Sequence, residues 1–133
     1  MITLSSGHLL EVNHLTKTFT VGGLFRKRGL IAVDDVSFRI STERPVIFTL
    51  AGESGSGKTT TARLILGFLE PTSGEIMYRG KNIWAMSKEE FKSYRKEVQA
   101  IFQDPYGVFN PLLKVDRVLK TPIKKFKVAN PEK

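Results

Sequence analysis

The chain has no cysteine among its 133 residues, which excludes disulfide bonds and thiolate metal sites. No stretch approaches the roughly eighteen apolar residues that a membrane-spanning helix needs. The N-terminus also lacks the basic segment and apolar run of a secretory signal. We therefore expect a soluble protein, or one that is held at a membrane through a partner. With 41% hydrophobic residues, the chain is apolar enough to form one domain.

Acidic residues are the minority among the charged ones, and the net charge is +8. Five of these eight charges lie in residues 114–133, where seven Lys and Arg outnumber two acids. A basic segment of this kind can contact nucleic acid or anionic lipid. Its only aromatic residue is Phe126, however, and lysines are common on solvent-facing helix positions. We favour a solvated helix face over a contact with nucleic acid.

A glycine-rich stretch is the most informative motif. Residues 52–59 read Gly-Glu-Ser-Gly-Ser-Gly-Lys-Thr and match the phosphate-binding pattern G-x-x-x-x-G-K-[ST]. The apolar segment 46–51 before it is typical of a strand, and residues 59–69 after it are apolar nearly all round a helix, which indicates a packed helix. Glycines let the backbone wrap an anion, and the N-terminus of a helix favours negative charge. This context predicts a nucleotide-binding loop.

Charge and geometry predict the role of each loop residue. Backbone N–H groups of residues 54–59 would surround the phosphates, the Lys58 ammonium would neutralise β- and γ-phosphate oxygens, and the Thr59 hydroxyl would bind Mg²⁺. The predicted nucleotide contacts in the loop are Gly52, Glu53, Ser54, Gly55, Ser56, Gly57, Lys58, Thr59 and Thr60. The alternative is a glycine-rich turn with a solvated lysine, which we disfavour because strand, loop and helix signals occur together.

The remaining segments predict an α/β chain that begins with antiparallel strands. Strands are expected at 8–21, at 31–40 with a bend at the two aspartates 34 and 35, at 75–79 after a turn at 71–74, and at 98–102. A capping box, Ser87 to Glu90, predicts a helix over 88–97. A second helix is expected from 115 onward, ended or kinked by Pro122.

Several ordered stretches give the chain a family likeness. They are NHLTKTF at 13–19, AVDDVSF at 32–38, the phosphate loop, GFLEPTSGE at 67–75, and IFQDPYG at 101–107 followed by Asn110-Pro111. This set resembles the ATP-binding-cassette (ABC) ATPases, in particular the ATP-binding subunits of dipeptide and oligopeptide importers. The resemblance implies a P-loop NTPase core with an N-terminal antiparallel β subdomain. Residues 1–133 would be the N-terminal part of one such domain, with an antiparallel region at 8–50, strand, loop and helix at 46–70, and a strand, helices and a glutamine-containing loop at 75–133.

The resemblance also assigns roles outside the phosphate loop. Phe19 stands where the family has an aromatic residue that stacks on adenine, and a rigid ring suits a flat base; the alternative is an ordinary core phenylalanine. Val33 is expected to pack beside the base. Gln103 matches the glutamine that reaches Mg²⁺ and the attacking water, so Lys58 and Gln103 are the predicted catalytic residues. Residues 107–109 depart from the Ser-Leu type of spacing of the peptide importers, which weakens the choice of peptide as substrate.

Parts of a complete hydrolytic site are missing from this sequence. Hydrolysis needs one acid for Mg²⁺ and another for the attacking water, but the only acids after Gln103 are Asp104, Asp116 and Glu132, and none follows an apolar strand. There is no Leu-Ser-Gly-Gly-type signature. His8 and His14 precede the loop and do not match the family's late switch histidine, so we interpret them as strand residues. We expect further strands from beyond Lys133 to complete the sheet, so that the chain is a truncated domain.

The resemblance implies an ATP- and Mg²⁺-dependent subunit of an importer at the cytoplasmic face of the membrane. Its partners would be membrane-spanning subunits, a second ATP-binding subunit and, indirectly, a solute-binding protein. Two alternatives stay open. One is a nucleotide-binding module without catalysis; the other is a non-transport ABC ATPase that acts on nucleic acid, which we favour less.

Overall fold

The computed structural model describes residues 7–22, 28–101 and 114–126. Gln103 and the segment 104–111 therefore lie outside the described residues, and their predicted roles stay predictions. The chain divides into two compact units, residues 1–95 and 96–133, and each is described by itself.

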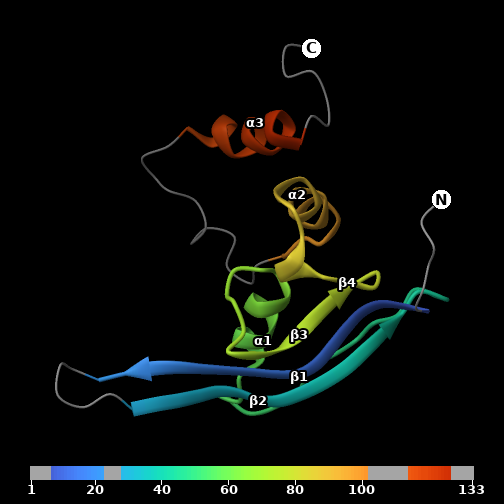
Figure 1. The fold of residues 1–133 in the computed structure, drawn as a ribbon. Helices are drawn as coiled ribbons and strands as arrows, with labels where there is room; N and C mark the ends of the chain where they lie inside the picture. Colours follow the sequence, from blue (N-terminus) through green and yellow to red (C-terminus); the bar gives the residue numbers. More distant parts are fainter. Residues whose placement is uncertain (1–6, 23–27, 102–113, 127–133) are drawn as a thin grey trace. The chain divides into compact units, whose positions relative to one another are not determined.

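The first unit is built on a four-stranded antiparallel sheet (Figure 1). Its strands are β1 (His8–Val21), β2 (Arg28–Ser41), β3 (Ser73–Tyr78) and β4 (Lys81–Asn82), in the order β2-β1-β3-β4. Strands β1 and β2 pair along almost their whole length, and β3 pairs on the other side of β1. The predicted antiparallel strands before the phosphate loop are thus confirmed.

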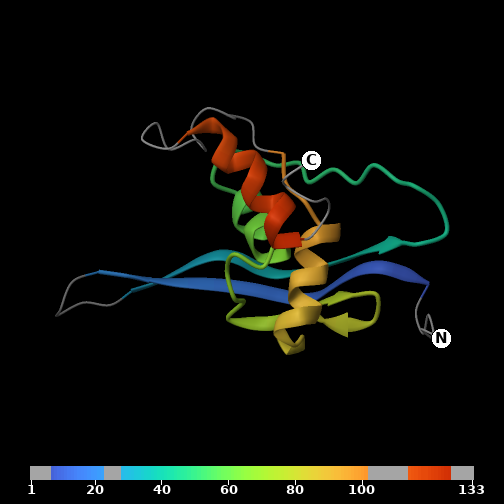
Figure 2. The same cartoon turned by 90° about the horizontal axis from the view of Figure 1, so that it is seen from above.

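The core lies on the face of this sheet that α1 (Lys58–Ile65) and α2 (Lys88–Glu97) cover (Figures 1 and 2). Leu10 and Val12 of β1 stand opposite Tyr78 and Ile76 of β3, so the four side chains share one face. Burying one such side chain contributes about 1.5–3 kcal/mol. The buried apolar residues are Leu10, Val12, Leu15, Val33, Leu64, Ile76, Tyr78, Ile83 and Tyr94.

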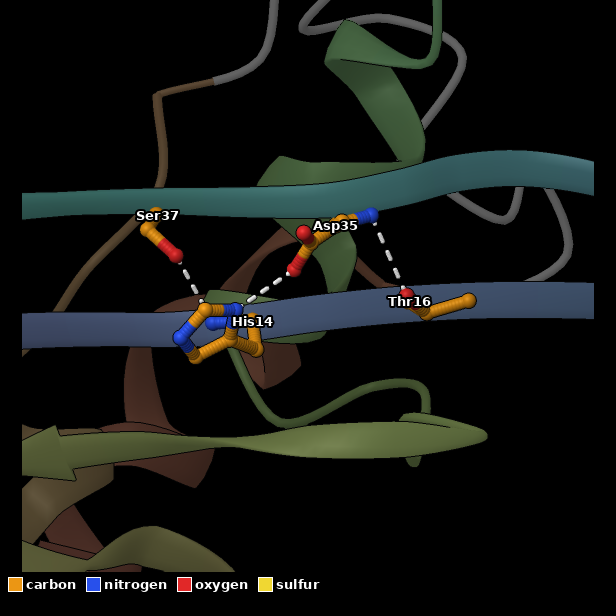
Figure 3. Close-up of polar contacts among 4 residues, drawn as sticks. All are labelled: His14, Thr16, Asp35 and Ser37. Atoms are coloured by element: carbon orange, nitrogen blue, oxygen red, sulfur yellow. Dashed lines mark hydrogen bonds and ion pairs between the residues drawn. The ribbon is translucent and has the colours of Figure 1, made fainter.

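Two β-bulges keep this face continuous along β1 and β2. His14 and Asp35 are the extra residues, and both adopt positive φ, 50° and 46°. The His14 Nδ1 lies 2.7 Å from Asp35 Oδ1, the His14 N–H donates to Ser37 Oγ, and the Asp35 N–H donates to Thr16 Oγ1 (Figure 3). Because an extra residue reverses the alternation of side chains, Leu15 stays on the core face after Val12. The predicted bend at Asp34-Asp35 is confirmed as this bulge.

Helix α1 is shorter than predicted. The N–H of Gly67 donates to the Leu64 carbonyl and that of Phe68 to the Arg63 carbonyl, which is a Schellman motif with Gly67 at φ 66°. This motif ends the helix at Ile65, so the expected continuation to residue 69 was wrong. Only Thr61 and Leu64 of α1 are buried. The prediction of a helix packed all round was also wrong, because one face of α1 is exposed in this chain.

Helix α2 begins and ends at the predicted residues, after a short 3₁₀ turn at Ile83–Ala85. The capping box is formed: the Ser87 N–H donates to Glu90 at 2.8 Å, and the Glu90 N–H donates to Ser87 Oγ. Tyr94 anchors the helix, because its hydroxyl donates to the Ile65 carbonyl and its ring packs edge-on against Tyr78. Burial raises the pKa of Tyr94 to about 12.

Glu90 also joins α2 to β4 through an ion pair with Lys81. The hydrogen bond from Lys81, and then those from Ser87, lower the pKa of Glu90 to about 2. A carboxylate with a lowered folded-state pKa stabilises the fold above its unfolded value, near pH 4.3, and this contribution is lost as the pH falls toward 2.

We expect Glu90→Gln to destabilise the chain at pH 7 and to lose most of that difference between about pH 4.3 and pH 2. Urea midpoints of the wild type and the variant across this range measure the effect. Glu89→Gln, in the same first turn, is the matched control and should show a smaller change. A Glu90→Gln difference that stays constant down to pH 2 would contradict the assignment.

Two predicted strands, at 46–51 and 98–102, are absent from the described residues. Residues 46–51 have no strand partner among the described residues, although Phe48 stacks on Phe38 with ring centroids 4.6 Å apart. Ile47 is 98% exposed. Residues 98–101 are likewise outside any strand, and Ile101 is fully exposed. Apolar sequence favours a strand only where a neighbouring strand accepts its backbone hydrogen bonds.

The second unit contains α3 (Val115–Phe126), which continues through Pro122. Of the two outcomes expected at Pro122, an end or a kink, the end of the helix was therefore wrong. Proline removes a single backbone donor, and the helix keeps local support from the Thr121 hydroxyl, which donates to the Arg117 carbonyl, and from the Asp116–Lys120 ion pair. Lys120 also lowers the pKa of Asp116 through a hydrogen bond. No helix in the described part of the chain is long and apolar enough to cross a membrane.

Candidate phosphate-binding site

The glycine-rich loop forms a tight turn that leads directly into α1. Gly52, Gly55 and Gly57 have positive φ angles of 156°, 84° and 86°. The Lys58 ammonium folds back over this turn and donates to the carbonyls of Gly52 at 2.7 Å and Glu53 at 2.6 Å, and to Ser56 Oγ at 3.2 Å. The lysine is therefore held at the centre of the loop rather than extended into solvent.

The N-terminus of α1 presents unpaired backbone donors at the same place. Its N-cap is Gly57, which supplies no side-chain cap, and the first intrahelical bond runs from the Thr61 N–H to the Gly57 carbonyl at 2.8 Å. The N–H groups of Lys58, Thr59 and Thr60 thus have no acceptor within the helix. Together with the helix dipole and the ammonium, they form a compact group of donors suited to an anion.

Strand β2 packs against this loop at Gly57. A Cβ atom on Gly57 would lie 2.2 Å from the Ala32 carbonyl oxygen and 3.6 Å from the Val33 side chain, so only glycine fits the contact. Ala32 is an extra residue in β2, because Lys17 stands opposite Val33 while Thr18 stands opposite Ile31. Val33 is 4% exposed. The structure thus brings Val33 to the loop, as a buried support under Gly57.

Phe19 lies on the same face of the sheet as Val33. Leu15, Lys17 and Phe19 alternate along β1 after the His14 bulge, so their side chains share the core face. The Phe19 ring is half-buried, and the Lys17 ammonium lies 5.4 Å from its centroid. Leu30, directly opposite Phe19, is 55% exposed, so the sheet is open beside the ring.

Thr59 is the metal ligand predicted from the phosphate loop. Within residues 7–22, 28–101 and 114–126, no three or more His, Asp or Glu side chains gather in a way that could hold an ion. Thr59 is exposed in the first turn of α1, beside Lys58. These residues fit a cation that arrives with a nucleotide, because the phosphate oxygens would supply further ligands.

Four residues around the site were not predicted from the sequence. Ala32 lies against Gly57, Lys17 lies over the Phe19 ring and donates to the Glu70 carbonyl, and the Thr18 N–H donates to the Thr72 hydroxyl. A signal was present for Lys17, which stands two residues before Phe19 and therefore on the same side of a strand. The other three are brought in by pairing between distant segments.

Comparison with known proteins agrees with this geometry. A family model described as ABC transporter matches residues 33–129. The chain is 38% identical over 125 residues to a putative oligopeptide transport ATP-binding protein, YkfD, of Bacillus subtilis, and 40% identical over 121 residues to the oligopeptide transport ATP-binding protein OppF of Haemophilus influenzae. These matches cover 94% and 87% of this chain, but 36% of each relative.

A solved structure of the ATP binding subunit of an ABC transporter has the same arrangement. Its TM-score is 0.63 at 26% identity, and the match covers 93% of this chain and 45% of that one. The predicted fold class, a P-loop core with an antiparallel β subdomain, is thereby confirmed. The chain spans about a third of the length of the two curated relatives. From the family model, the relatives and the shared fold, we conclude that the chain belongs to the ABC transporter family, among its ATP-binding proteins.

Proposed function

We propose that this chain binds MgATP through residues 52–60. The observation that supports this most directly is the convergence of the Lys58 ammonium with the free N–H groups at the start of α1. Such donors favour a polyphosphate, because each negative oxygen can accept a charge-assisted hydrogen bond.

The Lys58 ammonium is held in the loop, where it could contact phosphate oxygens. Its three donors are held by two carbonyls at 2.6–2.7 Å and by Ser56 Oγ at 3.2 Å. The bond to Ser56 is the longest, so we propose that a β- or γ-phosphate oxygen takes its place. The Thr59 hydroxyl would bind the accompanying Mg²⁺, which would screen charge between the phosphates.

We also propose that Phe19 stacks on adenine, with Val33 supporting the site from below. The Phe19 ring lies on the same face of the sheet as Val33. The sheet is open beside the ring, where Leu30 is exposed. Gln103 is proposed as the residue that reaches Mg²⁺ and the attacking water, on the strength of its sequence match alone.

In the whole protein, we propose that ATP hydrolysis at this site is coupled to import of peptides. The two relatives named above are described as oligopeptide transport proteins, which supports this substrate class. Membrane-spanning subunits and a second ATP-binding subunit are the proposed partners, at the cytoplasmic face of the membrane. ATP binding without turnover in the whole protein would instead favour the binding-only alternative.

Lys58→Met tests the phosphate site. Charge-assisted hydrogen bonds contribute about 1.5–3 kcal/mol, so we expect ATP to bind about 10–100-fold more weakly. Isothermal titration of the 133-residue chain with MgATP measures this.

Lys92→Met is the matched control, because it makes the same chemical change on an exposed position of α2. It should leave the affinity for ATP unchanged. Equal affinities of the Lys58→Met and wild-type chains for ATP would refute the proposed site.

A further inference from the structure

We infer that Lys17 and Thr72 are positioning residues that hold the Phe19 ring in a fixed place relative to the phosphate loop. The inference rests on the proposed ATP site and extends it. It names the contacts that would make the site respond to the base of a nucleotide as well as to its phosphates.

Lys17 joins three parts of the molecule. Its ammonium donates to the Glu70 carbonyl at 2.6 Å and lies 5.4 Å from the centroid of the Phe19 ring. Its backbone stands opposite Val33, the residue that supports Gly57. An ammonium at this distance attracts the electron-rich face of an aromatic ring, which limits rotation of the ring.

Thr72 forms hydrogen bonds with the backbone of β1 on either side of Lys17. Its N–H donates to the Thr16 carbonyl at 2.9 Å, and the Thr18 N–H donates to its hydroxyl at 3.0 Å. These two bonds flank Lys17 in the sequence. The hydroxyl also lies 3.4 Å from the Thr18 carbonyl. Residues 16–18 of β1, which immediately precede Phe19, are therefore hydrogen-bonded to residues 70–72.

Residues 70–72 follow α1, and the phosphate loop precedes it. The Schellman motif at Gly67 fixes the direction in which the chain leaves the helix. Lys17 and Thr72 thus connect the Phe19 ring to one end of a helix whose other end carries Lys58. A helix of this length is rigid, so the distance between ring and loop is set before any ligand binds.

This bracing predicts a selective effect on nucleotides. A ring held in advance loses less freedom when a base stacks on it, so the base binds more tightly. A polyphosphate without a base would contact the loop alone. Removing the Lys17 ammonium should therefore weaken ATP without weakening inorganic tripolyphosphate.

The experiment measures both ligands, each with Mg²⁺, on the 133-residue chain. For Lys17→Met and for Thr72→Val we expect ATP to bind about 3–10-fold more weakly, while tripolyphosphate affinity changes less than twofold. Lys17→Arg should restore ATP binding, because a guanidinium keeps both the donor and the cation over the ring. Lys92→Met serves as the control for loss of a surface charge.

Each other result overturns the inference in a recognisable way. Unchanged ATP affinity in Lys17→Met and Thr72→Val would show that the two residues do not position the ring. Equal losses for ATP and tripolyphosphate would also overturn it, because the two residues would then support the phosphate loop or the fold as a whole and not the ring. If the wild-type chain binds tripolyphosphate as tightly as ATP, Phe19 does not contact a base. If it binds neither ligand, the proposed function itself fails.

Discussion

Gly57→Ala is expected to weaken ATP binding by more than 100-fold and to destabilise the chain. The new Cβ would lie 2.2 Å from the Ala32 carbonyl oxygen, which belongs to the backbone of β2 and cannot rotate away. The residue would also keep a φ of 86°, which costs a non-glycine residue about 1–2 kcal/mol. Relief of the clash would move the start of α1 away from β2, and with it the free N–H groups and Lys58.

Gly55→Ala separates backbone strain from the clash. Gly55 has nearly the same φ, 84°, but a Cβ there would meet nothing within 4 Å. Urea denaturation should therefore show a larger loss of stability for Gly57→Ala than for Gly55→Ala, by about 1–3 kcal/mol. Titration with MgATP completes the comparison. Equal stability of the two variants would mean that the contact between the loop and Ala32 does not matter.

Elements with local signals could be predicted from the sequence. Helix α2 is specified by Ser87 and Glu90, whose side chains satisfy each other's backbone donors within four residues. Strands β1 and β2 follow from the alternating apolar residues expected at 8–21 and 31–40. The phosphate loop was also predictable, because its glycines, lysine and helix start are neighbours in the sequence.

Elements that depend on distant partners could not be predicted in this way. The segment 46–51 is as apolar as a buried strand, but nothing within the described ranges pairs with it. The end of α1 had a local signal in Gly67, which the apolar residues after it obscured.

The candidate site shows the same division. The motif placed Lys58 and Thr59 where the loop meets the start of α1, whereas the contacts of Lys17 with Glu70 and of Thr18 with Thr72 span more than fifty residues. Sequence alternation alone would have placed Phe19 incorrectly relative to Val12, since the bulge at His14 shifts the phase.

Gly74→Ala is expected to lower the free energy of unfolding by about 2–5 kcal/mol. Gly74 lies on β3 across from the His14 bulge, between the pairs Asn13–Glu75 and Thr16–Ser73. A Cβ there would lie 2.2 Å from the His14 carbonyl oxygen and 2.6 Å from that of Asn13, and φ is 82°. Strain of about 1–2 kcal/mol adds to an overpacking cost of about 1–3 kcal/mol.

Chemical denaturation monitored by circular dichroism measures this loss, with Gly7→Ala as the control because a Cβ there meets no atom within 4 Å. A Gly74→Ala chain as stable as Gly7→Ala would show that β3 does not pack closely on the bulge.

The expected loss has a consequence for the nucleotide site. The bulge decides which face Lys17 and Phe19 occupy, and Gly74 is the residue that lets β3 approach it. Displacement of the bulge in Gly74→Ala should therefore reduce ATP affinity too, although Gly74 lies outside the phosphate loop.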